Sequence, residues 1–318
     1  MKYYIGIDLG GTNIAAGVVN ENNEIVAKTS VKTGSGRPVN LIVDDMANAA
    51  KSAAESIGLT LNEVEWVGVG APGTANKASG VIEYSNNLGW YDVPLVQMLE
   101  ERTGKKVYIE NDANAAAYGE YVAGAAKKAD SSVMVTLGTG VGGGIVLNNK
   151  IYTGFNFAGA ELGHSVIVVD GRPCTCERRG CLEAYASATG LITTTREYME
   201  KYKDSVMWDL VEHDLSKVSG RTAFDAMRKG DKAGKMVVDE YIKYLACGIT
   251  NIINTFQPDI LCIGGGICHE GDTLMVPLKE IVKREVYSRN SAKNTEIVAA
   301  SLGNDAGIIG AALLGMAE

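Results

Sequence analysis

The chain has 318 residues, of which 46% are hydrophobic and 21% are charged. That composition is globular, and the length suits two domains with a core each. The net charge of −8, without any Lys/Arg-rich stripe, argues against nucleic acid and anionic membranes as partners.

The N-terminus runs directly into an apolar segment, without the hydrophobic region of a signal peptide. No later stretch holds about 18 consecutive apolar residues, so no membrane span is expected. We therefore expect a cytoplasmic protein whose six Cys stay reduced. Clustered Cys are then better interpreted as metal ligands than as disulfides.

Strands and helices alternate along the chain, which indicates the α/β class. Strands are expected at 3–9, 14–19, 24–31, 66–69, 107–109 and 259–263. Helices are expected at 38–57, 93–103 and 113–126, across most of 184–258, and at 305–316.

The pattern restarts in the middle of the chain. Residues 4–25 and residues 132–151 both read as strand, Leu-Gly turn, strand, Asn-rich turn and strand. This predicts an internal duplication, with each half opening in a β-meander. Two related halves suggest two lobes with a cleft between them, where ligand sites are common.

Gly-rich turns follow strands at residues 10–12, 138–144 and 264–266. None fits the P-loop or the dinucleotide fingerprint. A single such turn is explained equally well by a hairpin. Two related turns with Thr12 and Thr139 at their tips favour phosphate binding, because Gly lets backbone N–H groups approach closely. Asp8, beside the first turn, is either a Mg²⁺ ligand or a turn-forming residue.

Residues 110–114 read Glu-Asn-Asp-Ala-Asn at a strand-to-helix junction. One Asp or Asn would suffice as a helix N-cap, which is the simpler alternative. Four polar residues in five exceed that need. A carboxylate here can accept the proton of an attacking hydroxyl while a neighbouring amide orients the acceptor.

The sharpest local signal is His164-x9-Cys174-x-Cys176-x4-Cys181, which offers four tetrahedral ligands for a structural Zn²⁺. Glu161 and Glu183 flank this cluster. Each alone is an ordinary surface residue, whereas a metal knot would hold both as acceptors for sugar hydroxyls. The other Cys are interpreted as core residues or bystanders.

Together these residues resemble the ROK family of repressors, open reading frames and sugar kinases. The resemblance rests on four segments in the right order, spanning nearly the whole chain: Asp8 to Asn13, Leu137 to Gly144, Glu161-x-Gly163-His164, and Cys174 to Glu183. It implies a two-lobed, actin-like or hexokinase-type fold with duplicated ribonuclease-H-like domains and a central cleft. The small lobe would be 1–115 plus about 303–318, and the large lobe 116–302 with the zinc knot at 164–181.

The resemblance also implies roles for individual residues. Asp112 matches the catalytic base, and His164 matches both a zinc ligand and a sugar contact through its second ring nitrogen. The other matched sugar contacts are Gly73, Asn87, Asn111, Glu161 and Glu183. The ATP-binding residues implied are Asp8, Gly10, Gly11, Thr12, Asn13, Gly138, Thr139, Gly140, Gly264, Gly265 and Gly266. In one departure, Glu177 stands where the family usually has Gly.

The implied activity is ATP- and Mg²⁺-dependent phosphorylation of a hexose at its 6-hydroxyl. Asn87-Leu88-Gly89-Trp90 is common in the family's glucokinases, so glucose is the first expectation. Fructose, N-acetylmannosamine and N-acetylglucosamine remain alternatives, as does a non-catalytic sugar sensor. A repressor would carry an added N-terminal DNA-binding domain, for which we expect no room before residue 3. A polyphosphate donor would favour a basic patch, and none is evident. A homodimer or a dimer of dimers is implied.

Overall fold

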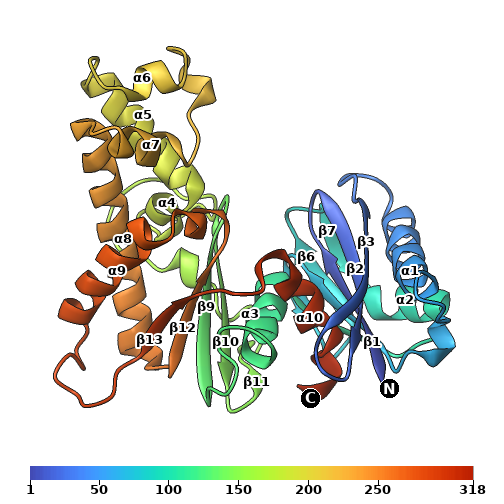
Figure 1. Cartoon of the computed structure of the whole chain (residues 1–318). Helices are drawn as coiled ribbons and strands as arrows, with labels where there is room; N and C mark the ends of the chain where they lie inside the picture. Colours follow the sequence, from blue (N-terminus) through green and yellow to red (C-terminus); the bar gives the residue numbers. More distant parts are fainter. Residues whose placement is uncertain (318) are drawn as a thin grey trace. The chain divides into compact units, whose positions relative to one another are not determined.

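The computed structural model of the protein describes residues 1–317. It is a mixed α/β structure that divides into two compact units (Figure 1). The first unit holds residues 1–134, 143–160 and the chain from residue 300, and the second holds 135–142 and 161–299. The lobe boundaries expected at residues 115 and 303 stay a prediction.

The first unit is built on a five-stranded sheet with the order β3-β2-β1-β4-β8. Its strands are β1 (Tyr3–Leu9), β2 (Asn13–Asn20), β3 (Ile25–Lys32), β4 (Val67–Ala71) and β8 (Val107–Asn111). β1, β2 and β3 form an antiparallel meander, while β1, β4 and β8 run parallel. Parallel strands end at one edge of a sheet, so the segments after Leu9, Ala71 and Asn111 meet there.

Helices cover both faces of this sheet (Figure 1). They are α1 (Val39–Glu55), α2 (Leu95–Thr103), α3 (Asp112–Val122) and α10 (Ala306–Ala312). Ile5 and Ile7 point into the core shared with α1 and α2, whereas Tyr4 packs with α10 on the other face. A strand buried on both faces reads as a continuous apolar run, as β1 does.

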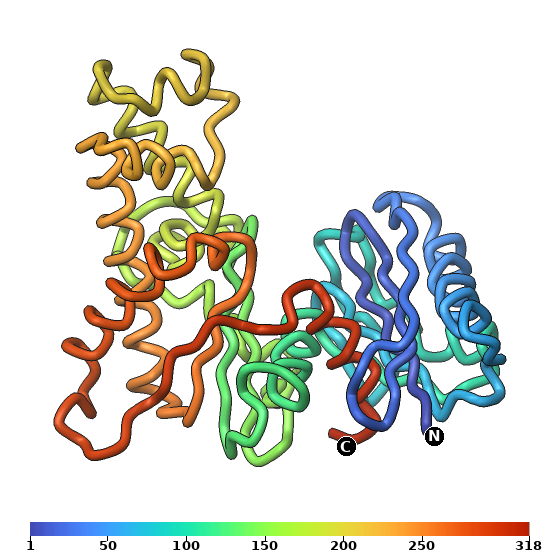
Figure 2. Tube along the Cα trace, viewed as in Figure 1, coloured from blue at the N-terminus to red at the C-terminus, as the bar shows by residue number. Residues whose placement is uncertain are grey.

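The C-terminal helix α10 lies directly against β1, β4 and α3, where Figure 2 shows the red end of the chain beside the green α3. The approach is close because glycines face the helix. A Cβ on Gly68 would collide with the backbone oxygen of Ala311, and one on Gly310 with that of Ala115. Small residues therefore let α10 pack backbone to backbone.

A small antiparallel sheet, not anticipated from the sequence, follows β4. Its strands are β5 (Thr74–Asn76), β6 (Val81–Ser85) and β7 (Trp90–Val93). These strands are too short to show a clear alternation of apolar and polar residues. The sequence therefore signals only the turns between them. The sheet places Gly73 at one end and Asn87 in its β6–β7 turn.

The second sheet has the order β11-β10-β9-β12-β13, which repeats the first strand for strand. Its strands are β9 (Ser131–Leu137), β10 (Val141–Leu147), β11 (Lys150–Ile151), β12 (Ile260–Gly264) and β13 (Glu296–Ala299). The predicted duplication is confirmed by this order. β13 was not expected, because four residues carry no periodic signal.

The rest of the second unit, apart from its part of this sheet, is mostly helical. Its helices are α4 (Glu183–Ala186), α5 (Ala188–Lys201), α6 (Met207–Leu210), α7 (Thr222–Arg228), α8 (Lys232–Phe256) and α9 (Asp272–Glu285). α8 is the central one, since α4, α5, α7 and α9 all pack on it (Figure 1). Short 3-10 segments are η1 (Leu61–Glu63), η2 (Leu162–His164), η3 (Leu215–Lys217), η4 (Gly266–Glu270), η5 (Gly303–Asp305) and η6 (Leu314–Met316).

Two expected helices are shorter than their sequences suggested. The helix expected at 113–126 ends at Val122, where the buried Glu120 carboxylate accepts a 2.8 Å hydrogen bond from the backbone N–H of Ala125. The carboxylate oxygen thus takes the place of the backbone carbonyl that would accept this hydrogen bond in a continuing helix, and the chain turns away. The helix expected at 305–316 is α-helical only from Ala306 to Ala312. Within residues 1–317, every helix is too short or too polar to cross a membrane.

Candidate functional site

The first Gly-rich turn, between β1 and β2, is closed and pinned by hydrogen bonds. Gly10 donates its N–H to the oxygen of Asn13 at 2.9 Å. The buried Thr33, just after β3, donates its N–H to Thr12 O at 2.9 Å and its hydroxyl to Gly10 O at 2.6 Å. The side chain of Thr12 stays exposed at the tip. The turn is thus preformed, and Thr33 is a supporting residue that the sequence did not reveal.

Two carboxylates meet at the sheet edge beside this turn. Burial, together with the nearby Asp112 carboxylate, raises the pKa of Asp8 to about 6. Burial also raises the pKa of Asp112. A carboxylate with a raised pKa is a better proton acceptor, which is the property a general base needs.

Helix α10 approaches Asp8 closely. A Cβ on Gly307 would lie 2.8 Å from Asp8 Oδ2 and 2.9 Å from its Cγ. An added Cβ would therefore displace either the Asp8 carboxylate or α10, and this contact, almost the whole chain length away in sequence, could not be found from the sequence.

Asn111 caps α3, as the simpler sequence interpretation proposed. Its Oδ1 accepts hydrogen bonds from the backbone N–H groups of Ala113 at 2.9 Å and Asn114 at 3.2 Å. Its Nδ2 donates to Gly73 O at 3.1 Å. An amide group has two N–H donors, and the Asn111 side chain also hydrogen-bonds to the Asp112 carboxylate, so it connects Gly73 to Asp112.

The other polar residues of this segment support one another. The buried Glu110 accepts hydrogen bonds from Asn111 N at 2.9 Å and from Asn114 Nδ2 at 3.0 Å, and burial raises the pKa of Glu110. The surplus of polar residues is therefore largely structural. Asp112 differs, because its carboxylate is held by its immediate neighbours: Oδ1 accepts a 2.9 Å hydrogen bond from Ala113 N, and the Asn111 side chain also hydrogen-bonds to it.

Gly73 and Asn87 lie at the same edge. Gly73 has a φ of +103°, and a Cβ there would collide with the backbone of Tyr84 in β6, so only glycine fits. Asn87 is exposed, and its Cβ lies 3.8 Å from the position a Cβ on Gly11 would take. The first unit thus gathers Asp8, residues 10–13, Gly73, Asn87, Asn111 and Asp112.

In the second unit, the other two Gly-rich turns lie side by side. Gly138 donates its N–H to Gly140 O at 3.0 Å, and Thr139 O accepts a 2.8 Å hydrogen bond from the Thr189 hydroxyl. Gly265, with a φ of +90°, lies so close to the backbone of Leu137 that a Cβ would collide with it. The turn at 264–266 is therefore adjacent to the turn at 138–140.

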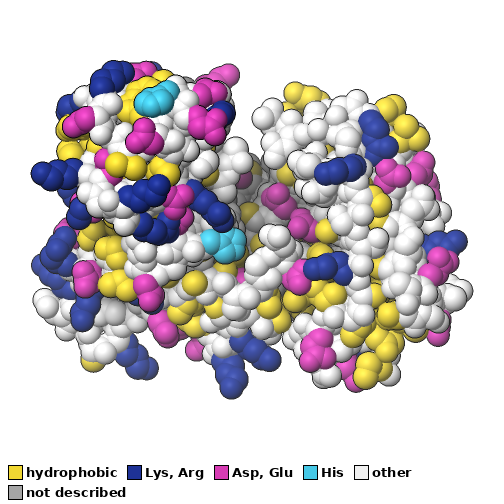
Figure 3. Space-filling view, turned by 45° about the horizontal axis from the view of Figure 1, so that its top comes forward, with side chains coloured by type: hydrophobic (Ala, Val, Ile, Leu, Met, Phe, Trp, Pro, Cys, Tyr) yellow, Lys and Arg dark blue, Asp and Glu magenta, His cyan; other side chains and the backbone are white. Residues whose placement is uncertain are grey.

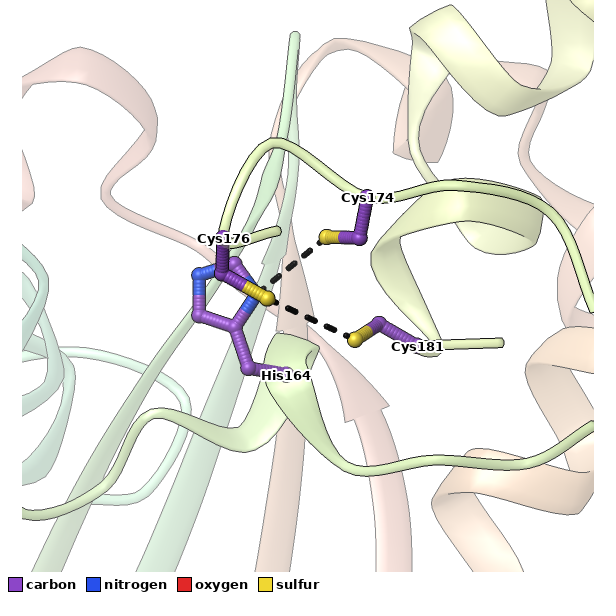
Figure 4. Close-up of side chains that lie close together, drawn as sticks. All are labelled: His164, Cys174, Cys176 and Cys181. Atoms are coloured by element: carbon purple, nitrogen blue, oxygen red, sulfur yellow. Dashed lines mark hydrogen bonds between the residues drawn. The ribbon is translucent and has the colours of Figure 1, made fainter. Parts of the chain in front are cut away.

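Four predicted metal ligands converge in the same unit (Figure 4). Their ligand atoms all lie within 4.8 Å of one another: His164, Cys174, Cys176 and Cys181. Cys174 Sγ lies 3.5 Å from His164 Nδ1, and Cys176 Sγ lies 3.7 Å from Cys181 Sγ. A tetrahedral ion held by bonds of about 2.0–2.3 Å sets its ligands about 3.5–3.8 Å apart, so the donor set fits a metal ion.

The predicted acidic residues flank this cluster differently. Glu183 Oε2 accepts a 2.9 Å hydrogen bond from Val141 N, and Oε1 accepts one of 3.1 Å from the Thr175 hydroxyl. Glu161 is exposed and directly precedes η2, which carries His164. The second unit therefore gathers both Gly-rich turns, the metal ligands and Glu183 in one region.

Comparison with known proteins agrees with this geometry. A model of the ROK family matches residues 4–318. A glucokinase from Thermotoga maritima is 41% identical, covering 97% of this chain and 95% of the relative. A glucokinase from Halalkalibacterium halodurans is 37% identical, covering 97% and 93%. A ROK family glucokinase from Streptomyces griseus, solved with glucose and AMPPNP, superposes with a TM-score of 0.82 at 34% identity, covering 98% of each chain.

Proposed function

This chain belongs to the ROK family, and from that premise we propose that it is an ATP-dependent hexose kinase, a glucokinase that converts glucose to glucose 6-phosphate. It has the actin-like, hexokinase-type fold of the family, so the fold expected from the sequence is confirmed. The observation that carries the proposal is Asp112, a carboxylate of raised pKa at the sheet edge beside Asp8 and the first Gly-rich turn.

The proposed reaction is a direct phosphoryl transfer. Asp112 accepts the proton of the 6-hydroxyl while that oxygen bonds to the γ-phosphorus, and the bond to the β-phosphate oxygen breaks to release ADP. Asp8 would hold Mg²⁺, which would supply positive charge to neutralise the phosphates of ATP. Because Asn111 is fixed by its cap, its side-chain amide is positioned to orient the sugar beside Asp112.

The remaining substrate contacts are proposed on the same motifs. Phosphates contact the turns at residues 10–13 and 138–140, and residues 264–266 take the adenosine side. Hexose contacts are Gly73, Asn87, Asn111, Glu161, His164 and Glu183. His164 Nδ1 faces Cys174, which leaves Nε2 for the sugar.

We propose Zn²⁺ as the metal at His164, Cys174, Cys176 and Cys181, since three thiolates and an imidazole suit it and four protein ligands leave no open position. Metal analysis of the purified protein is expected to give about one zinc per chain. Cys176→Ser should lower both the zinc content and the thermal unfolding midpoint. A protein folded at wild-type stability without zinc would refute the assignment.

ATP is the proposed donor. On the face drawn in Figure 3, Lys and Arg side chains are interspersed with Asp and Glu side chains, not gathered into the stripe that a polyanion would favour. A homodimer or dimer of dimers in the cytoplasm is proposed on the family resemblance, and light scattering would measure the assembly.

The deciding experiment is an ADP-release assay with MgATP against glucose, fructose, mannose, N-acetylglucosamine and N-acetylmannosamine. Glucose is expected to give the highest kcat/KM. Turnover of another sugar alone would replace the substrate, and no turnover by folded, zinc-loaded protein would favour a sensor or another donor.

The base assignment has its own test. Asp112→Asn should lower kcat by roughly 10²–10⁴-fold, the usual contribution of a general base, while glucose still binds. Asp130→Asn, an exposed change in the same unit, is the matched control. If Asp112→Asn keeps more than a few per cent of the activity, Asp112 is not the base.

A further inference from the structure

A cavity lies in the second unit, away from the residues discussed so far. It has a volume of about 290 Å³, opens to solvent on one side, and is lined by α9, the segment that follows α9, β13 and Ile253 of α8. That volume is near the lower end of small-molecule pockets, which hold roughly 300–1,000 Å³. The cavity therefore suits a small ligand.

The cavity is separate from the Gly-rich turn of the same sheet. It reaches β13 at Glu296, which pairs with Ile260 at the start of β12. The turn at 264–266 follows the other end of β12. Ile297, which also lines the cavity, pairs with Leu261, so three residues of strand separate the cavity from the turn, about 10 Å at 3.3 Å per residue. A molecule in this cavity would not occupy the position proposed for adenosine.

Three cationic side chains line the cavity: Lys279, Lys283 and Arg289. Among residues 1–317, no carboxylate pairs with any of them. Lys279 and Lys283 are four residues apart on α9, so they repel each other slightly. The helix dipole favours a positive charge in the last turn, which accounts for the position of Lys283. It does not account for Lys279, which lies earlier in α9, or for Arg289, which lies beyond the helix.

The rest of the lining defines the kind of ligand. Val282, Ile297 and Ile253 are buried and supply an aliphatic floor. Glu296 is the one acidic residue in the lining. Three positive charges against one negative charge leave a surplus of two, which matches a phosphate monoester, with about −1.5 to −2 at pH 7, better than a monocarboxylate.

We propose that this cavity binds a small organic phosphate, with the phosphate held by Lys279, Lys283 and Arg289 and an apolar or ring-shaped body on the aliphatic floor. The site is independent of the proposed kinase reaction. The phosphate could come from the product of that reaction or from another metabolite, and the choice of probes distinguishes these sources.

The test is isothermal titration of the full chain, with glucose and MgAMPPNP present so that the kinase site is occupied. The probes are phenyl phosphate, inorganic phosphate and glucose 6-phosphate. We expect phenyl phosphate to bind at one site and more tightly than inorganic phosphate, because the floor then contributes. If glucose 6-phosphate binds at least as tightly as phenyl phosphate, the product is the ligand, and otherwise an apolar metabolite is.

Charge variants then locate the binding. Lys279→Met/Lys283→Met should weaken phenyl phosphate binding roughly tenfold or more, the effect of losing charge-assisted contacts. Glu296→Gln should strengthen it, because the one repelling carboxylate is removed. Opposite effects of these changes would not arise from a general loss of stability. Arg289→Met, in a surface segment, repeats the test if the double variant does not fold.

Lys243→Met/Lys293→Met is the matched control, since both lysines are exposed in the same unit and neither lines the cavity. The control should bind as the wild type does. Three results would each overturn the proposal: no binding of phenyl phosphate up to roughly 10 mM, equal binding by the Lys279 and Lys283 double variant, or equal weakening in the control.

Discussion

The Oε2 atom of Glu183 accepts a 2.9 Å hydrogen bond from the backbone N–H of Val141, directly after the turn at 138–140. Its other oxygen accepts a bond from Thr175, between two of the metal ligands. One carboxylate thus connects the Gly-rich turn to the metal cluster. Its hydrogen bonds give Glu183 a positioning role, in addition to the sugar contact that we propose.

Glu183→Gln should affect both substrates. An amide can still accept from Val141 N–H, but a neutral acceptor is weaker than a charged one by about 1 kcal/mol, which corresponds to roughly fivefold to tenfold in affinity. We expect the KM for MgATP to rise together with the KM for glucose. Steady-state kinetics with each substrate varied would measure this.

Glu200→Gln is the control for that experiment, since Glu200 is exposed on α5. Its kinetics should match the wild type. A rise in the KM for glucose alone, with the KM for MgATP unchanged, would show that Glu183 does not position the turn.

The raised pKa of Asp8 makes stability depend on pH. With a pKa of about 6 in the folded chain against 3.8 as its ordinary value, the folded chain holds a proton between those pH values that the unfolded chain has lost. The stability from this group is complete below pH 3.8 and is lost as the pH rises through 6. Asp8→Asn should therefore raise the free energy of unfolding at pH 8 by on the order of 2 kcal/mol, and change it little near pH 4.

Denaturant unfolding without Mg²⁺, at both pH values, would measure this difference. Asp130→Asn, an exposed change in the same unit, is the matched control. Asp8→Asn is also expected to abolish most activity, so stability and activity change in opposite directions. If Asp8→Asn instead lowered the free energy of unfolding at pH 8, the charged carboxylate would stabilise the folded chain through a favourable contact, and burial would not be its main effect.

The sequence predicted what local patterns encode. The strand from Tyr3 to Leu9 was predicted correctly, because a short apolar run that ends in a Gly-rich turn is typical of a buried strand. The convergence of His164, Cys174, Cys176 and Cys181 could be predicted because their spacing in the sequence is short. What escaped was set by distant partners: Thr33 closes a turn more than twenty residues earlier, and Gly307 makes room for Asp8. Neither residue type signals such a role without knowledge of its neighbour.

Gly307→Ala tests one of those distant contacts. The added Cβ would lie 2.8 Å from Asp8 Oδ2, so either the carboxylate or α10 must move. Because we propose that this carboxylate binds Mg²⁺, its displacement should lower kcat/KM for MgATP by roughly tenfold to a hundredfold, since small misplacements of reacting groups are costly. Gly220→Ala is the control, because no atom lies within 4 Å of the added Cβ. Wild-type kinetics in Gly307→Ala would mean that the position of Asp8 is not critical.

Glu177 adopts a backbone conformation that its side chain disfavours. Its φ is +67°, in the left-handed region, and it lies in the turn between Cys176 and Cys181, at the position where the family usually has Gly. A left-handed conformation costs an ordinary residue about 1–2 kcal/mol, whereas Gly adopts it freely but loses more entropy on folding. Glu177→Gly should therefore raise the free energy of unfolding of the zinc-loaded protein by up to about 1 kcal/mol. Zinc content should stay the same, because no ligand changes.

Denaturant unfolding would measure this gain in the stability of Glu177→Gly. Glu200→Gly on α5 is the control, where the same change should lower the free energy of unfolding by about 1 kcal/mol. A loss of stability in Glu177→Gly would show that the Glu177 side chain itself supports the turn.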